Sequence, residues 1–375
     1  MMGETLNAAN KVERKRYPVL DLDRFIAALI IIFIHIFPEG STTSSIGLDN
    51  SIPMLLTESF IYPILRIAAP IFFVISSFLL FQKVKSDPNN KWKYVGSFCL
   101  RLLFLYLFWY IVGLPITIKD IVGYASSGDT YNLLRYFVLT LWKGAPRGYW
   151  FLVALALSIV ITSLANSKKS LIILTVIAGL LFIYGCFNSS YFGLLASSDV
   201  PFIKALYNIG EYLELAFCPL EALIFVVLGK IFALYGPFKI KGNIFWIILS
   251  FFLLAGEVFL VLYFNLLIYP DVYILLPLFV FFFINLIIGI ENHNERFISI
   301  TKKLKEVGSF SYLFHLQFFV YLHWILDSTG YNIFRDQIGL LLIPYVVCVL
   351  LCFLLQTLFE RLSSHRYLGF LRYSY

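Results

Sequence analysis

The sequence predicts an all-α integral membrane protein, a single bundle of about ten transmembrane helices. Two observations predict this fold class. Of the 375 residues, 60% are hydrophobic and 14% are charged, whereas a soluble domain carries about 25% charged residues. The hydrophobic residues also gather in runs of about 20, the length of helix that crosses the hydrocarbon core of a bilayer. No polar segment is long enough to build a soluble domain.

Turn-forming residues separate the apolar runs and place the spans. We expect helices because lipid leaves every backbone N–H and C=O group to be satisfied within its own segment. Breakers occur at Pro38–Gly40, Asp87–Asn90 and Gly236–Pro237,. The shorter apolar segment Tyr131–Trp142 is predicted to be an interfacial or re-entrant helix on the outer side. The ten spans are predicted at 17–37, 59–82, 94–115, 149–166, 170–187, 211–235, 243–266, 271–291, 307–327 and 337–360.

The distribution of basic residues predicts the orientation in the membrane. With a cytoplasmic N-terminus, 20 of the 29 Lys and Arg residues fall on the cytoplasmic side and 6 on the outer side. This bias follows the positive-inside rule and predicts that both termini are cytoplasmic. It accounts for the net charge of +7 without a nucleic-acid partner. The predicted organisation is a tail at 1–16, a membrane domain at 17–360 and a second tail at 361–375.

The N-terminus and the cysteines narrow the possibilities further. The polar N-terminal segment shows no cleavable signal, so we expect the first helix to direct insertion. The five cysteines lie in apolar spans without a CxxC motif, and we interpret them as small buried hydrophobes,. The sequence predicts neither a metal site nor a tightly bound cofactor.

The first span carries two ionisable residues, Arg24 and His35. They are eleven residues apart, which places them within about 20° on one helix face and separates them by about 16 Å along the axis. A charged residue at mid-bilayer costs about 2.5–3.5 kcal/mol on insertion scales, so this face should look into the bundle. The alternatives are a snorkelling Arg24, aided by Asp21 or Asp23, and a hydrogen-bonded packing role for His35.

Two further arginines lie within spans. Arg101 lies at a depth similar to that of Arg24, and two guanidinium groups at one level suit a phosphorylated ligand. The alternative for Arg101 is snorkelling. Arg66 enters the second span from the outer side, closer in depth to His35, and an ion pair with Glu58 is the alternative for it.

The sixth and ninth predicted spans carry the remaining candidates. Glu214 and Glu221 are seven residues apart, so on one helix they face the same way,. We expect them to neutralise the arginines of neighbouring spans or to contribute to the site. Ser311 and His315 are one turn apart and are expected to hydrogen-bond, with a structural role as the alternative. Motifs of soluble enzymes such as GxSxG, HExxH and the P-loop are absent from the sequence,.

Five segments follow one another along the chain in a recognisable order. The first has Arg24, ten residues and then His35, and the third is centred on Arg101 in a leucine-rich context. The other three are Pro70–Leu80, Gly148–Leu152 and Gly308–His315. In order and spacing these segments resemble the membrane acyltransferase family 3, whose members acylate bacterial cell-envelope glycans and related molecules.

The sequence departs from the family pattern in three respects. Ser77 stands where the family usually has glycine, which could tighten or polarise a helix contact. Phe98 stands where the family often has a basic residue, three positions before the arginine of the third span. No soluble esterase-like domain follows the last predicted helix, so transfer is expected to finish within the membrane domain or on a separate protein.

The resemblance implies an acyl-CoA donor, with acetyl-CoA as the first expectation, bound from the cytoplasmic side of a bacterial plasma membrane. The implied acceptor is a hydroxyl of a glycan or lipid-linked sugar reached from the outer side. Arg24 and Arg101 would hold the donor, and His35 would act as the base or carry the acyl group transiently. The predicted catalytic residues are thus His35 and Arg24. The predicted substrate-binding residues are Arg101, Arg66, Ser76, Trp150, His315, Glu214 and Glu221.

Two other functions fit the same sequence. A transporter or flippase for a polysaccharide or its precursor would use the buried charges to line its path, and it would move glycan without consuming a thioester. A non-catalytic membrane subunit that keeps the family architecture would tolerate alanine at His35.

Overall fold

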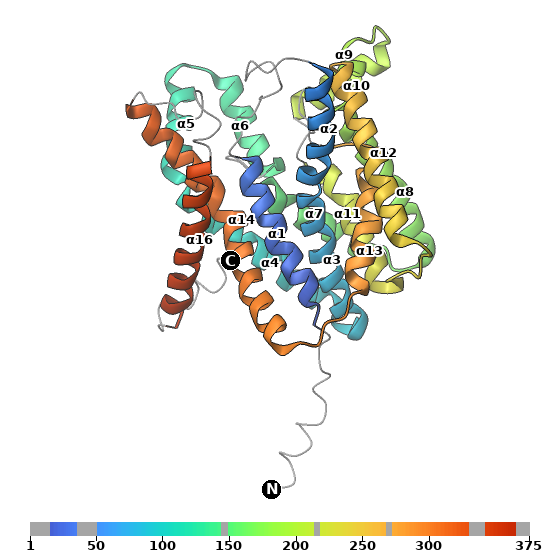
Figure 1. Cartoon of the computed structure of the whole chain (residues 1–375). Coiled ribbons are helices and arrows are strands. Elements are labelled where there is room, and N and C mark those ends of the chain that lie inside the picture. Colours follow the sequence, from blue (N-terminus) through green and yellow to red (C-terminus); the bar gives the residue numbers. More distant parts are fainter. Residues whose placement is uncertain are drawn as a thin grey trace.

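The computed structural model describes residues 16–35, 51–143, 149–213, 218–267, 272–329 and 342–364. Within these ranges the regular elements are all helices, arranged as one bundle (Figure 1). They are α1 (Pro18–Ile34), α2 (Ile52–Arg66), α3 (Ala68–Ser86), η1 (Pro88–Asn90), α4 (Lys91–Val112), α5 (Leu114–Ser126), α6 (Thr130–Lys143), α7 (Trp150–Leu164), α8 (Lys168–Phe187), α9 (Phe192–Ala196), α10 (Pro201–Leu213), α11 (Pro219–Tyr235), α12 (Asn243–Tyr263), α13 (Leu276–Gly289), α14 (Glu295–Thr329) and α16 (Leu342–Leu362).

The helices support the prediction of an integral membrane protein. Each predicted span coincides with at least one helix. Among the described residues, five helical stretches are long and apolar enough to cross a membrane, and α7 and α13 are shorter apolar helices. The number of ten crossings and the cytoplasmic placement of the termini stay predictions. The segment predicted to be interfacial is a helix, α6, which lies beside α5 at one end of the bundle (Figure 1).

Large apolar side chains cover the outside of the bundle. On α4, for example, Leu100 is 66% exposed and Ile111 is also 66% exposed. The peripheral helices α8, α12 and α16 expose similar rows of Ile, Leu, Val and Phe. Soluble proteins rarely expose apolar surface on this scale. The surface is therefore suited to contact with lipid.

The centre of the bundle is the pair α3 and α11, which pack more extensively than any other two helices. They approach so closely because Gly229 of α11 has no side chain. A Cβ at Gly229 would lie 2.4 Å from Ser77 Oγ and 2.5 Å from the Val74 carbonyl oxygen. The Ser77 hydroxyl donates to the Val226 carbonyl oxygen across the same contact, at 2.5 Å. Ser77 of α3 thus makes a close and polar contact with α11. The glycine that leaves room for this contact, Gly229, lies on α11.

A break at Ile67 separates α2 from α3. Pro70 explains the position of the break, because proline has no N–H to donate to the carbonyl four residues earlier, that of Arg66,. Arg66 is consequently the last residue of α2. The break places its side chain at a helix end within the bundle.

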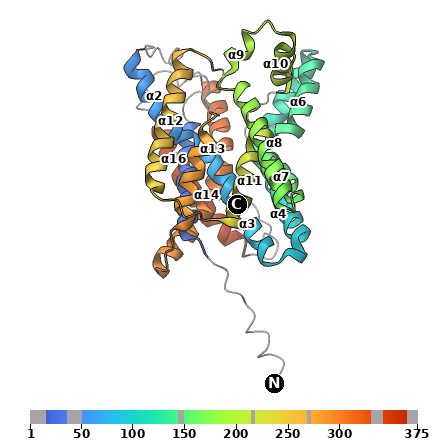
Figure 2. The same ribbon diagram turned by 90° about the vertical axis from the view of Figure 1, so that its right-hand side faces the viewer.

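The helices α1 and α14 run parallel and touch at several levels. Near the start of α1, Asp21 forms an ion pair with Lys305 of α14. One turn further, Gly308 packs against the backbone of α1, and a Cβ there would lie 2.9 Å from Phe25 Cα. This close approach fixes the position of the α1 backbone at Arg24. In the views of Figures 1 and 2, both helices begin at the lower end of the bundle.

Lysines cap helix ends at this same end of the bundle, which we call the basic end. Lys230 Nζ donates to two carbonyl oxygens at the end of α7, at 2.8 and 2.6 Å, and Lys91 Nζ donates to a third at 3.1 Å. Lys85 Nζ does the same for the end of α11, at 3.2 and 3.0 Å. A cation at a helix C-terminus satisfies orphan carbonyls and the helix dipole. The end of α3 and start of α4, the end of α7 and the end of α11 thus lie together. The positive-inside rule predicts the lysines of these three segments on one side of the membrane.

One predicted span is wrong at its start. The span 211–235 was expected to be a single helix, but α10 ends at Leu213 and α11 begins at Pro219, with an extended Cys218 before it. Pro219 explains the restart, because a proline disfavours the helical conformation in the residue before it. Glu221 lies in the first turn of α11, after this restart. Glu214 itself lies outside the described residues.

Candidate active site

Two histidines from helices far apart in the sequence meet inside the bundle. His35 caps the C-terminus of α1, and His315 lies in the middle of α14. Their ring centroids are 5.1 Å apart, with an angle of 36° between the ring planes. His315 is 1% exposed and His35 is half-buried. The pair therefore offers one imidazole on the accessible side and one behind it.

The hydrogen bond of His315 fixes its tautomer. Its Nδ1 lies 2.9 Å from the backbone carbonyl oxygen of Ser311. A carbonyl oxygen can only accept, so Nδ1 carries the proton and Nε2 of the neutral ring carries the lone pair. This Nε2 is buried and has no hydrogen-bond partner within the described residues. The expected bond between His315 and Ser311 is present, but it uses the backbone of Ser311, and the ring keeps an acceptor for other use.

Arg66 lies near the histidine pair, which agrees with its predicted depth in the membrane, close to that of His35. It is close enough to His35 to interact electrostatically. Its guanidinium also lies 6.0 Å from the ring centroid of Tyr62, one turn back on α2. The break at Ile67 brings this positive charge to the histidine level.

A second pair of like groups lies at the level of Arg24. Arg24 interacts electrostatically with Asp21 and with Arg101 of α4. Its Nε is buried without a hydrogen-bond partner in the described part of the chain. Arg101 is exposed in the middle of α4, and in lipid such a guanidinium is costly. Two arginines at one level, of which Arg24 keeps an unused donor, are suited to bind an anion.

The site thus has two levels on one helix. The arginine level is separated from the histidine level by eleven residues of α1, about 16 Å along its axis,. The same two levels recur on α14, where Gly308 contacts the backbone at Arg24 and His315 reaches His35. A ligand that contacts both levels must be long.

The structure also places the other predicted site residues. Trp150 is half-buried, with its ring 5.7 Å from that of Phe73 on α3. Ser76 is half-buried on the same helix, and it is the neighbouring serine, Ser77, that forms the hydrogen bond between helices. Glu221 is 3% exposed and lies against Gly185 of α8. Its expected part in neutralising an arginine stays a prediction.

Sequence reasoning missed three features that surround the site. The contact of His35 with His315 joins residues 280 positions apart, and no local pattern indicates it. The hydrogen bond from Gln317 Nε2 to the hydroxyl of Tyr149, at 2.7 Å, braces α14 beside the pair. The packing of Gly308 on α1 is the third feature. A glycine within the predicted span was the only signal for it.

Comparison with known families decides the class. The family model described as an acyltransferase domain matches residues 17–358. The chain belongs to acyltransferase family 3. The family match confirms the resemblance expected from the five ordered segments and supports a membrane acyltransferase. Both levels of the site lie inside the matched range.

Individual relatives add little about the reaction. Two curated proteins of Enterococcus faecalis, each described as an amino-acid racemase, are similar to the chain. One is 25% identical over 271 residues, covering 70% of this chain and 35% of the relative. The other is 20% identical over 190 residues, covering 50% of this chain and 25% of the relative. The chain thus spans about a third or less of their length. No solved structure matches the chain.

Proposed function

We propose that this acyltransferase family 3 protein moves an acyl group, acetyl first among the expectations, from acyl-CoA to a hydroxyl of a cell-surface glycan or lipid-linked sugar. One observation carries the proposal. The contact between His35 and His315 lies at one level of the site, and Arg24 with Arg101 lies at the other. Acyl transfer needs a base for the hydroxyl and a holder for the donor. The histidine level supplies the base, and the arginine level supplies the holder.

In the proposed step, the neutral imidazole of His35 takes the proton of the acceptor hydroxyl. The hydroxyl oxygen attacks the thioester carbonyl carbon, the new C–O bond forms and the C–S bond breaks. The thiolate of CoA leaves and receives the proton from His35, so the products are the ester and CoA. The positive charge of Arg66 beside His35 stabilises the negative charge that develops on the carbonyl oxygen,.

His315 acts as a positioning residue in this scheme. Its Nδ1–H is committed to the Ser311 carbonyl, so Nε2 is available to accept an N–H of His35, directly or through one water. Such a bond would direct the other nitrogen of His35 toward the hydroxyl. Hydrogen bonds of this kind often shorten only when the substrate is bound.

The test compares glycans from cells with and without the gene by mass spectrometry, and follows acyl transfer from labelled acyl-CoA by the purified protein. Wild type should add one acyl mass to a glycan, and His35→Ala should not. His293→Ala is the matched control, because His293 is 89% exposed in a loop beside Glu291, and it should act like wild type. A transporter would be favoured if wild type moved glycan across vesicle membranes without consuming acyl-CoA.

A further inference from the structure

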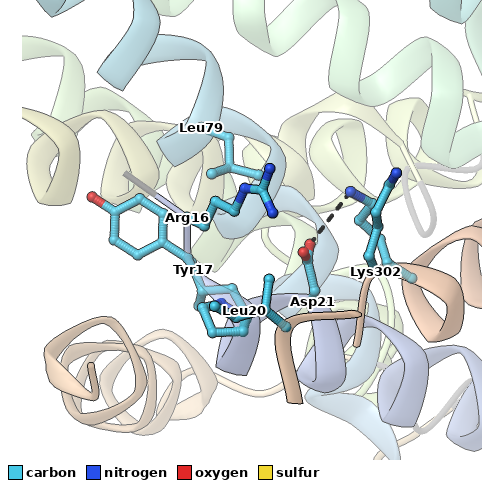
Figure 3. Close-up of a pocket in the computed structure, with 9 residues that line it drawn as sticks. Arg16, Tyr17, Leu20, Asp21, Leu79 and Lys302 are labelled. Atoms are coloured by element: carbon cyan, nitrogen blue, oxygen red, sulfur yellow. Dashed lines mark ion pairs between the residues drawn. The ribbon is translucent and has the colours of Figure 1, made fainter. Parts of the chain in front are cut away.

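A pocket of about 260 Å³ opens at the basic end, where the start of α1 meets α14, and no step of the proposed reaction uses it. Three cationic residues line it, Arg16, Lys302 and Lys305, together with one carboxylate, Asp21, and apolar side chains. Figure 3 shows the charged ends of Arg16 and Lys302 on either side of the Asp21 carboxylate. The lining is therefore rich in positive charge.

The one carboxylate of the pocket is already engaged. Asp21 lies 3.8 Å from Lys305 Nζ, and both side chains are partly buried, at 23% and 32% exposure. The two other cations line the pocket without a second carboxylate there. Lys302 and Arg16 are exposed, so a ligand that enters from the aqueous side can reach them. The pocket carries a net positive charge and suits an anion.

Positive charge continues from the pocket into the bundle. Asp21, in the pocket wall, interacts electrostatically with Arg24, and Arg24 with Arg101. Asp21 in the pocket wall lies three residues before Arg24 on α1, or about 4.5 Å along the helix axis. The histidine level lies about 16 Å beyond. The three levels follow one line along α1, with anion-binding groups at two of them and a base at the third.

An aromatic side chain distinguishes this pocket from a plain phosphate site. Tyr17 lines it and is held by an edge-on contact with Phe78 of α3, with ring centroids 5.1 Å apart. Purine bases stack on such rings. A ligand with phosphates, a purine and a distant reactive group would contact all three levels.

We propose that this pocket binds the phosphorylated nucleotide end of the donor, with Arg16 and Lys302 on the phosphates and Tyr17 beside the base. The proposal rests on the proposed function, since it assumes that the donor is a CoA thioester. It assigns a site outside the arginine and histidine levels. The anchored nucleotide would leave the thioester arm to extend past Arg24 and Arg101 toward the histidine level.

The experiment measures dissociation constants of the purified full-length protein for CoA and for pantetheine, which lacks the phosphates and the nucleotide. Lys302→Ala and Arg16→Ala should each raise the dissociation constant for CoA about tenfold, because each removes a charge-assisted contact. Neither should change the value for pantetheine. Lys303→Ala is the matched control, because Lys303 is exposed on the same helix and does not line the pocket; it should bind CoA as wild type does.

Acyl transfer from acyl-CoA by wild type is measured in parallel. It distinguishes failure of the pocket proposal from failure of the proposed function. If wild type transfers the acyl group and both pocket variants keep wild-type affinity for CoA, the pocket proposal is overturned and the proposed function stands. If wild type neither binds CoA nor consumes acyl-CoA, both fall. The pocket would instead be a lipid site if the variants lost affinity for phosphatidylglycerol vesicles while binding CoA normally.

Discussion

The contact between Gly308 and the α1 backbone gives a prediction whose magnitude follows from the structure. In Gly308→Ala the new Cβ would lie 2.9 Å from Phe25 Cα, where ordinary contacts begin at 3.4 Å. The neighbour is backbone, so α1 and α14 must separate by about half an ångström. Overpacking of this kind costs about 1–3 kcal/mol. The shift also moves Arg24, the residue before Phe25 on α1.

The matched control is Gly179→Ala in α8, where a Cβ would meet nothing within 4 Å. Both glycines lie within helices, so the gain in helix propensity of about 0.5–1 kcal/mol is common to the two variants. Their free energies of unfolding in detergent should therefore differ by about 1–3 kcal/mol, with Gly308→Ala the less stable. Its kcat/KM for acyl transfer should also fall about tenfold, since small misplacements of binding groups are costly. Equal stability and activity of the two variants would refute the reasoning.

Three other substitutions follow from the same contacts. Gly229→Ala should lower the free energy of unfolding by about 3 kcal/mol, because two atoms of α3 lie within 2.5 Å of the new Cβ,; thermal unfolding in detergent checks this, and a wild-type midpoint would contradict it. Arg101→Lys should raise the KM for acyl-CoA about tenfold with kcat nearly unchanged, because lysine loses the planar fork; an unchanged KM would leave Arg101 as a snorkelling residue. Lys230→Met should cost about 1.5–3 kcal/mol, because two carbonyls at the end of α7 lose a charged donor,; exposed Lys241→Met is the control, and equal unfolding midpoints would count against the capping role.

The sequence predicted correctly those features that depend on the helical repeat within one short segment. Apolar runs located the helices, and helical spacing placed Arg24 and His35 on one helix in the predicted order. The depth of Arg66 was also inferred correctly, since the structure brings it to His35. These properties depend on short stretches of chain and on the cost of burying charge.

Contacts between distant helices were not available from the sequence. His35 and His315 meet because α1 and α14 run parallel and touch at Gly308, and no residue pattern specifies that partner. The error in the span 211–235 has a different cause. An apolar stretch crosses Pro219, and hydropathy was given more weight than the proline, which marks where α11 begins,.

The central claim is that the histidine pair carries out the acyl transfer, and a double-mutant cycle tests it most directly. Turnover of labelled acyl-CoA is measured for wild type, His35→Ala, His315→Ala and the double variant, with CoA binding measured alongside. A general base contributes about 10²–10⁴-fold, so His35→Ala should lose that factor in kcat and still bind CoA. His315→Ala should lose less, and the double variant should be no slower than His35→Ala, because His315 acts through His35. Near wild-type turnover in His35→Ala, or a double variant slower by the product of both losses, would contradict the account.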